Sequence, residues 1–267
     1  MKIVVCVKEI PDPDIAASVF QVDEAARAVV PVPGLRSVAS PFDEQAIEVA
    51  LRLRDQLGSA AISLVTLGDE TAKAIVKNGL ALGADDAYLL VDEAFDGGDA
   101  TTTARALAAA IRKIGGVDLV LPGRPAADDD AGIVGCGIAE ILGVPAVTFA
   151  MDVAVDGGAL VVERSLGDGS ETVEAPLPAL VTVSHEVGKV RPASLRETMK
   201  AARKPMTVWT AADLELTAGD VGAAGARRTL ERLAVPKNDV RCEFLAGESP
   251  EALAATLIER LSAARIL

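Results

Sequence analysis

Aromatic residues are scarce in this 267-residue chain: one Trp, one Tyr and five Phe make up 3% of it. Proteins that bind single-stranded nucleic acids stack bases on aromatic rings and follow the phosphates with basic residues. Here 26 Lys and Arg are outnumbered by 39 Asp and Glu, which gives a formal net charge of −13. The resulting field repels a polyanion. The composition argues against nucleic-acid binding, so any phosphate must be held locally by backbone N–H groups or a small basic patch.

Cysteine is also sparse. Cys6, Cys136 and Cys242 lie far apart and form no CxxC pair. This spacing supports neither a disulfide framework nor a zinc site. We therefore expect three buried thiols in a reducing cytoplasm.

Long hydrophobic runs and histidine are lacking as well. No window approaches about 18 apolar residues, so no membrane span is expected. The N-terminus MKIVVCVKEI is too short in its apolar part for a signal peptide, which favours a cytoplasmic location. His185 is the single histidine, and no nucleophile stands beside it. Hydrolytic and acyl-transfer chemistry are therefore disfavoured.

The first half of the chain alternates between two periodicities. With 50% hydrophobic and 24% charged residues, the chain has the composition of a soluble globular protein. Apolar runs predict strands, and i, i+3, i+4, i+7 stripes ended by glycine predict helices. The strands are Lys2–Lys8, Ala61–Leu67, Ala87–Val91, Val117–Leu121 and a short one around Val147–Phe149. The helices are one that begins at Pro41 or Asp43 and is stopped by Gly58, then Glu70–Leu82, Thr101–Ile114 and Ala131–Leu142. This alternation predicts a doubly wound α/β fold with a mostly parallel sheet.

The pattern changes after Met151. Short apolar runs separated by Gly/Asp clusters predict antiparallel hairpins: Val153–Val155, Ala159–Glu163, Thr172–Ala175 and Ala179–Val183. Residues 185–205 show no regular strand. A strand at Met206–Trp209, a Gly/Ala-rich linker at Gly219–Gly225 and a last helix from Glu251 to about Ala264 complete the chain.

Four loops follow the carboxyl ends of the predicted parallel strands, after Lys8, Leu67, Val91 and Leu121. Ligands bind at such ends, near the point where strand order reverses. None of the loops contains GxGxxG or a Walker A motif. In the last loop, PGRPAADDDAGIVGCGIAE, Gly132, Gly135 and Gly137 fall just inside the predicted helix. Small residues there let a phosphate approach free N–H groups, but close packing of helix against sheet explains them equally well.

The acidic run Asp128–Asp130 in the same loop has three interpretations. Asp130 can cap the helix while its neighbours stay in solvent. One carboxylate can accept a ribose hydroxyl, as acidic residues do in dinucleotide folds. A metal site would need converging ligands from several loops, and no second acidic or histidine cluster stands out. We therefore expect no metal.

Several segments together resemble the beta subunit of electron transfer flavoproteins. VCVKEIPDPD resembles the family's VxVKxxPD opening, and SPFDEQAIEVALRL its NPxDxxAxExAL segment, with Ser40 in place of Asn. LALGADDAYLL, DLVLPGRPAADDDAGIVG and VRPASLRETMKAARKP match three further motifs in order. The resemblance runs from Met1 to about Asp213 with nearly gapless spacing.

The resemblance implies an electron carrier rather than an enzyme: a heterodimer with an alpha subunit that holds an FAD, and a nucleotide in the beta subunit. That nucleotide is AMP in simple members and a second FAD in electron-bifurcating members, which oxidise NADH. Carried over residue by residue, the nucleotide site comprises Cys6, Lys8, Ser40, Pro41, Phe42, Asp43, Leu67, Arg124, Pro125, Ala126, Ala127, Asp128, Asp129, Asp130, Ala131, Gly132, Ile133, Val134 and Gly135.

One further segment bears on the choice between FAD and AMP. AFDGGDATTTARAL resembles the bifurcating members' FxGxDTxATxxxL, which adds Asp99 and Thr103 to the site. The chain departs from that pattern at Ala100, and again at Ala127 and Asp129. The resemblance favours FAD but leaves AMP open.

Residues 185–205 carry a local excess of positive charge. Six Lys/Arg against two Glu give this segment a net charge of +4, and Leu195 stands between Ser194 and Arg196. A small apolar anchor ringed by charge suits transient docking. By resemblance this is the family's recognition arm, which contacts an acyl-CoA or other dehydrogenase through Leu195, Arg191, Arg196 and Lys200. The domains expected are a nucleotide-binding unit (1–184), a protruding recognition arm (185–205) and a C-terminal segment contacting the partner subunit (206–267).

Two other classes share parts of this pattern. A regulatory nucleotide-sensing module of the universal-stress type has the same fold plan, but such a domain could stop near Ala150. A self-contained NAD-dependent dehydrogenase would need the glycine fingerprint that this chain lacks.

Overall fold

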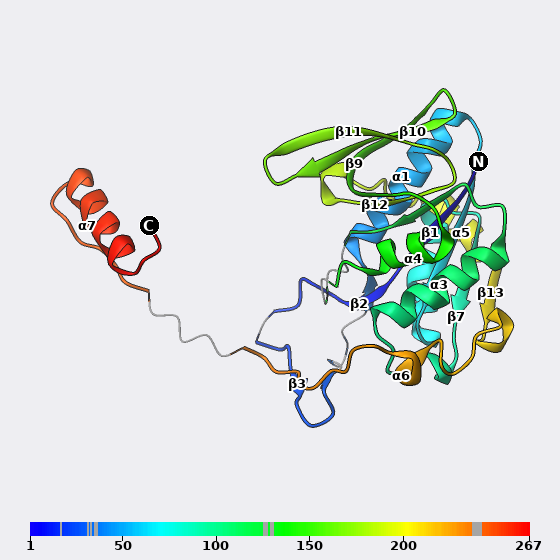
Figure 1. Cartoon of the computed structure of the whole chain (residues 1–267), viewed down its shortest axis with the longest axis horizontal. Coiled ribbons are helices and arrows are strands. Elements are labelled where there is room, and N and C mark those ends of the chain that lie inside the picture. Colours follow the sequence, from blue (N-terminus) through cyan, green and yellow to red (C-terminus); the bar gives the residue numbers. More distant parts are fainter. Residues whose placement is uncertain are drawn as a thin grey trace.

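The computed structural model describes residues 1–16, 18–30, 32, 34, 37–124, 128, 131–236 and 242–267. Its centre is one nine-stranded sheet (Figure 1). Across the sheet the strands lie in the order β11 (Gly169–Ala175), β10 (Ala159–Leu166), β9 (Ala146–Asp156), β12 (Ala179–Val183), β8 (Leu119–Pro122), β1 (Lys2–Cys6), β6 (Ala61–Leu67), β7 (Asp86–Leu90) and β13 (Met206–Trp209).

The strand order reverses at the middle of this sheet. From β9 to β13 all neighbouring pairs are parallel, whereas β9–β10 and β10–β11 are antiparallel. The chain runs from β1 to β6 and β7 on one side, then crosses to β8 on the other side of β1. The space between the ends of β1 and β8 is therefore the topological switch point, where Cys6 pairs in register with Pro122.

Helices cover both faces of the parallel part: α1 (Pro41–Leu57), α2 (Lys73–Leu82), α3 (Ala100–Ile114) and α4 (Val134–Leu142). Side chains of β1 alternate between two hydrophobic clusters, as the pleat of a strand requires. Ile3 and Val5 pack with α1 and α2, whereas Val4 and Cys6 pack with α3 and α4. The predicted doubly wound α/β class is confirmed.

Shorter elements connect or extend this core. They are β2 (Glu9–Pro11), which pairs with β5 (Ser37–Ala39); β3 (Val22–Asp23), which pairs with β4 (Ala28–Val29); the 3-10 turns η1 (Glu70–Ala72), η2 (Glu93–Phe95), η3 (His185–Val187) and η4 (Ala212–Leu214); and the helices α5 (Leu195–Ala201), α6 (Gly222–Gly225) and α7 (Pro250–Ala263). Helix α7 lies apart from the main body in Figure 1, and none of its residues is buried. No helix in the described part of the chain is long and apolar enough to cross a membrane.

The region after Met151 differs from the prediction in one respect. β9, β10 and β11 form the expected antiparallel hairpins, and β9 joins the two short strands predicted around Val147–Phe149 and Val153–Val155. Ala179–Val183, however, belongs to no hairpin: as β12 it lies between β8 and β9, parallel to both. All five of its residues are buried, which is typical of a parallel strand covered on both faces.

The arm, residues 185–205, contains a helix where the sequence indicated irregular chain. Ser194 caps α5 by accepting the Glu197 N–H at 3.2 Å, and α5 packs against α2. At the end of the arm the Lys204 ammonium donates to the carbonyls of Leu80 and Ala84, at 2.8 and 2.6 Å. These bonds give hydrogen-bond donors to carbonyl groups at and just after the end of α2, and they hold the arm to the body.

The cysteine prediction is confirmed at one position only. Cys6 is buried in β1, but Cys136 and Cys242 are exposed. The expectation of three buried thiols is wrong because Cys136 stands at the open start of α4 and Cys242 in the extended C-terminal segment.

Candidate functional site

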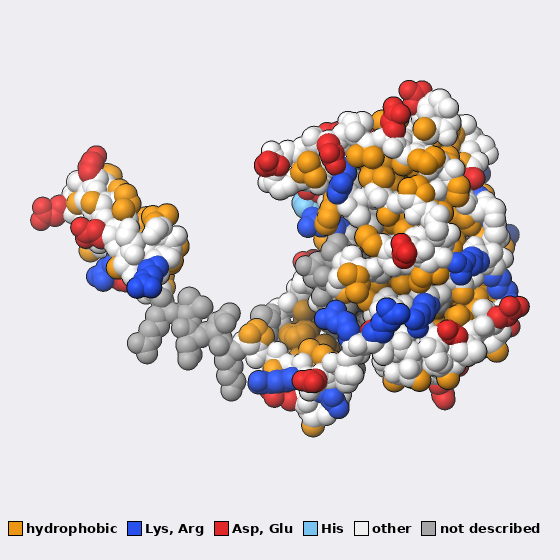
Figure 2. All heavy atoms as spheres, viewed as in Figure 1, with side chains coloured by type: hydrophobic (Ala, Val, Ile, Leu, Met, Phe, Trp, Pro, Cys, Tyr) orange, Lys and Arg blue, Asp and Glu red, His pale blue; other side chains and the backbone are white. Residues whose placement is uncertain are grey.

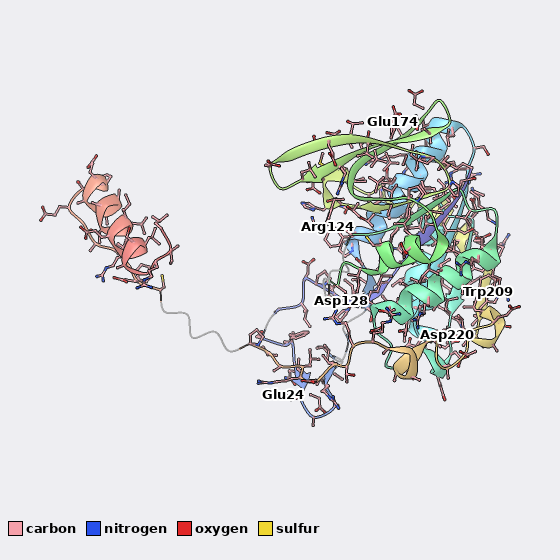
Figure 3. All side chains as sticks on the ribbon, viewed as in Figure 1. Glu24, Arg124, Asp128, Glu174, Trp209 and Asp220 are labelled. Atoms are coloured by element: carbon pink, nitrogen blue, oxygen red, sulfur yellow. The ribbon has the colours of Figure 1, made fainter. Side chains whose placement is uncertain are left out.

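A cavity of about 580 Å³ opens at the carboxyl ends of the parallel strands, at the switch point between β1 and β8. Its size lies within the usual range for small-molecule sites. It is lined by Cys6, Val7, Lys8, Asp43, Leu67, Gly98, Asp99, Ala100, Thr103, Leu107, Pro122, Gly123, Arg124, Ala131, Gly132, Val134, Gly135, Cys136, Thr148, Phe149 and Thr182. Figure 3 labels Arg124 and Asp128, which lie on the side of the body between β11 and β3.

Most of the predicted nucleotide-site residues meet at this cavity. Those in its lining are Cys6, Lys8, Asp43, Leu67, Asp99, Thr103, Arg124, Ala131, Gly132, Val134 and Gly135. Five other described residues do not line it: Ser40, Pro41, Phe42, Asp128 and Ile133. Pro125, Ala126, Ala127, Asp129 and Asp130 lie outside the described residues.

Asp43 joins the two strands that border the switch point. It stands in the first turn of α1 and is 7% exposed. One carboxylate oxygen accepts the Lys8 N–H at 2.7 Å, and the other accepts the Gly123 N–H at 3.0 Å. Burial raises the pKa of Asp43 to about 7, against the lowering effect of these two hydrogen bonds. Asp43 therefore fixes the ends of β1 and β8 at the distance that shapes the cavity.

Gly123 is required by this arrangement. A Cβ at position 123 would overlap the Asp43 carboxylate and come within 2.7 Å of the Phe42 carbonyl carbon. Only glycine lets the chain after β8 approach the start of α1 so closely. Cys6 lies beside the same carboxylate, and burial, followed by the Asp43 charge, raises the pKa of its thiol to about 12. This thiol stays protonated and unreactive at neutral pH.

The start of α4 supplies backbone donors to the cavity. The helix begins at Val134 with Ile133 at its N-cap, three residues later than predicted. Asp130, the predicted cap, lies outside the described residues. Among the described residues no side chain bonds to its first-turn N–H groups. Uncapped N–H groups and the helix dipole favour an anion here. Val134, Gly135 and Cys136 of this first turn all face the cavity.

Gly135 also serves the packing of α4 on the sheet. A Cβ there would lie 2.9 Å from Thr182 Cγ2 and 3.1 Å from Pro122 Cγ. Substitution of Gly135 by valine is therefore expected to disturb folding before it disturbs a ligand. The packing explanation of this glycine, which the sequence left open, has direct structural support.

Asp99 is saturated by backbone donors. As N-cap of α3 it accepts the N–H groups of Thr101 and Thr102 on one oxygen, at 2.9 and 3.0 Å. Its other oxygen accepts the N–H groups of Arg227 and Arg228, at 2.8 and 3.0 Å. These bonds, acting against desolvation, hold the pKa of Asp99 below its usual value. Its four acceptor positions are occupied, so Asp99 lines the cavity as a structural group.

The far wall of the cavity comes from a bulge in β9. Phe149 has a left-handed backbone (φ 61°) where the register between β9 and β12 shifts. Its N–H donates to Thr182 Oγ1 at 3.0 Å, and the Arg124 guanidinium lies 4.7 Å above its ring. Such a conformation is costly for an aromatic residue and persists where the surroundings fix it. The sequence analysis missed Thr148, Phe149 and Thr182. It assigned the strand of Thr182 to a hairpin outside the parallel sheet, and it took site residues only from the loops after four earlier strands.

Charge at the mouth of the cavity is partly paired. The Lys8 ammonium lies 2.9 Å from an Asp128 carboxylate oxygen, with both side chains partly exposed. Exposed pairs of this kind contribute little to stability and exchange readily. Within the described residues no group of three His, Cys, Asp or Glu side chains is placed to hold a metal ion.

The arm presents its apolar residues outward and one of its arginines inward. Leu195 is 79% exposed, and Met199 follows it one turn later, 69% exposed. The Arg191 guanidinium instead pairs with Glu48 at 2.9 Å and with Asp55 at 2.9 Å. Because Glu48 is buried in α1, this predicted partner-contacting residue anchors the arm to the body. Arg196 is exposed, and Lys200 pairs with Glu197 at 2.7 Å.

Fold and site together define a doubly wound α/β protein whose main described cavity lies at the topological switch point. The sequence model of a protein family described as "Electron transfer flavoprotein domain" matches residues 33–214. The chain belongs to the electron transfer flavoprotein family, and the full-length similarities below place it with the beta subunits.

Three relatives illustrate the similarity. The chain is 34% identical to an electron transfer flavoprotein subunit beta of Thermoanaerobacterium thermosaccharolyticum, over all of both chains. It is 33% identical, again over both full lengths, to the caffeyl-CoA reductase-Etf complex subunit CarD of Acetobacterium woodii. A subunit beta from Clostridium acetobutylicum is 37% identical over 84% of each chain. The predicted family is confirmed, which sets aside the universal-stress module and the self-contained dehydrogenase.

Proposed function

We propose that this chain binds an adenine nucleotide in the switch-point cavity and works in electron transfer as half of a heterodimer with an alpha subunit. The observation that carries the proposal is the first turn of α4, whose N–H groups bond to no side chain among the described residues and face a cavity bordered by the ends of β1 and β8. A helix start without a side-chain cap in such a place suits a phosphate. The net negative charge of the chain repels a phosphate, and these N–H groups together with Arg124 offset that repulsion locally.

The residues around the cavity have different roles in binding the nucleotide. The first turn of α4 would hold the phosphate, and Gly132 leaves room beside it. Cys6, Leu67 and Leu107 provide apolar walls suited to the faces of a base. A flavin bound here would supply one- and two-electron transfer, whereas AMP would serve structure alone. The part of this chain is to bind, orient and shield the nucleotide.

The occupant is either FAD or AMP, and we favour FAD. Asp99 and Thr103, the two residues brought in by the bifurcating motif, both line the cavity. Phe149 and Arg124 add a ring and a guanidinium plane at its far wall. With FAD bound, the complex would be of the bifurcating kind and oxidise NADH.

We expect the purified heterodimer, once denatured, to release two FAD for each pair of chains. One FAD and one AMP would instead identify a simple carrier. Chromatography of the released nucleotides, measured against protein concentration, separates the two outcomes. Recovery of a single FAD and nothing else would contradict the nucleotide site in this chain.

The C-terminal segment is proposed to hold the alpha subunit. Helix α7 exposes Leu257 at 47% and Ile258 at 57%, and Phe244 ahead of it is 90% exposed. Figure 2 shows hydrophobic side chains along one side of this helix and acidic ones on the other. An amphipathic helix with an uncovered apolar face is a helix-in-groove ligand. The arm, residues 185–205, is proposed to meet the dehydrogenase.

A further inference from the structure

The segment that leaves the body toward α7 is attached beside the nucleotide cavity. Gly222 has a left-handed backbone (φ 57°), and a Cβ there would overlap the carbonyl oxygen of Ala94. The Ala223 N–H donates to the Asp96 carbonyl at 2.9 Å, and the Arg105 guanidinium donates to the Asp220 carbonyl at 3.3 Å. Residues 220–225 are thereby docked against the loop that precedes α3.

The last strong attachment in this stretch is Asp99. It accepts the N–H groups of Arg227 and Arg228 on one oxygen, while its other oxygen caps α3. After this point the described residues are largely exposed, and the next hydrogen bond joins Arg27 to the Leu230 carbonyl at 2.6 Å. Asp99 therefore marks where the C-terminal segment leaves the body.

The same residue belongs to the cavity wall. Gly98, Asp99, Ala100 and Thr103 line the cavity at the start of α3. A nucleotide that packs against this turn restricts the position of the Asp99 carboxylate, because the capping bonds fix it to the turn. A carboxylate held in place in turn fixes the backbone at residues 227 and 228.

We propose that Asp99 couples the nucleotide cavity to capture of the alpha subunit, by fixing the direction in which the chain leaves the body after residue 228. This inference rests on the proposed function of both the cavity and the C-terminal segment. Linkage is reciprocal: if nucleotide strengthens binding of the alpha subunit, the alpha subunit strengthens binding of the nucleotide by the same factor.

Asp99→Asn tests the coupling with little change in shape. The amide oxygen can still cap α3, but the NH₂ group cannot accept the N–H groups of Arg227 and Arg228. Asp92→Asn is the matched control. Asp92 likewise accepts a local N–H, from Ala94, and a distant one, from Ala211, both at 3.0 Å, but lies outside the cavity lining. Arg228→Pro removes the backbone N–H group of residue 228, which donates to Asp99. Arg228→Ala keeps that N–H group and is the second control.

The measurement is the dissociation constant of the alpha subunit for the full-length chain freed of nucleotide, with and without saturating AMP. In the wild type, in Asp92→Asn and in Arg228→Ala, AMP should tighten binding of the alpha subunit by about five-fold or more, within the usual range of coupling between sites. In Asp99→Asn and Arg228→Pro that factor should fall toward one. Amide exchange should quicken at residues 227 and 228 in Asp99→Asn, and at residue 227 in Arg228→Pro, which has no N–H group at residue 228.

Two results would overturn the coupling alone, and a third would overturn the proposed function with it. Wild-type protein that binds AMP but shows a factor of one would leave the proposed function intact and remove this inference alone. An unchanged factor in both Asp99→Asn and Arg228→Pro would do the same. Wild-type protein that binds neither AMP nor FAD would overturn the proposed function as well.

Discussion

Replacement of Asp43 by alanine is expected to lower the free energy of unfolding by up to about 2–6 kcal/mol, because two partly buried N–H groups lose their acceptor, and a fully buried one costs about 1–3 kcal/mol. These donors, on Lys8 and Gly123, end the two strands that border the switch point. Nucleotide content should fall along with stability, since the cavity loses the group that fixes its width. Chemical denaturation and released nucleotide measure the two effects.

Asp118→Ala is the matched control for this variant. Asp118 accepts the Lys2 N–H at 2.7 Å and thus also links β8 to β1, but at the amino-terminal ends of these strands, away from the cavity. Its loss should cost stability and leave nucleotide content unchanged. Equal loss of nucleotide in both variants at matched stability would show that Asp43 has no particular relation to the cavity.

The pH dependence of the free energy of unfolding provides a second test of the role of Asp43. With its pKa raised to about 7 by burial, against about 3.9 for an unfolded aspartate, the folded chain binds the extra proton between these values. The stability that this residue contributes is therefore fully present below about pH 4 and is lost as the pH rises through 7. In Asp43→Asn this part of the pH profile should vanish.

Leu195→Ala is expected to weaken docking to the electron-donating dehydrogenase by roughly ten-fold, with flavin content and thermal stability nearly unchanged. The side chain is 79% exposed, so its removal leaves no cavity in the folded chain. The loss of one apolar contact at an interface costs about 1–2 kcal/mol. Reduction of the heterodimer by the dehydrogenase, followed at several concentrations, gives the half-saturation value.

Leu166→Ala provides the same substitution at another exposed leucine, 40% exposed at the end of β10. It should leave docking unchanged. If Leu195→Ala also leaves rate and half-saturation unchanged, the arm is only a connector.

Much of the core was predictable because local signals and burial agree there. β6 and β13 match the predicted strands at both ends, and α1 starts at Pro41 and ends before Gly58, which adopts the left-handed conformation of a C-cap. The loops chosen from strand ends alone supply most of the cavity lining. That part of the site follows from the rule that parallel strands present their carboxyl ends at one edge.

The remainder depends on contacts between distant parts of the chain. β12 was assigned to a hairpin because the turns ahead of it are rich in Gly and Asp, although its mostly apolar, β-branched sequence ALVTV lacks the alternation of a half-exposed strand and would have indicated a buried parallel strand. The pairing of Asp99 with Arg227 and Arg228 joins residues more than 120 positions apart and leaves no periodicity to detect. The inward position of Arg191 likewise depends on Glu48, which only the folded packing buries.

The central claim, that the switch-point cavity holds an adenine nucleotide, is tested most directly by thiol labelling. Cys136 is exposed in the cavity lining, Cys242 is exposed outside it, and Cys6 is buried. With nucleotide removed, a thiol reagent should modify Cys136 and Cys242 in the native chain and spare Cys6. Added FAD or AMP at about 100 times its dissociation constant should slow modification of Cys136 by about 100-fold, since only the free form reacts.

Cys242 should react at the same rate with and without nucleotide, and peptide mass spectrometry distinguishes the two sites. Protection of Cys136 alone is the result that this account predicts. An unchanged rate at Cys136 under saturating nucleotide, or equal slowing at Cys242, would contradict it.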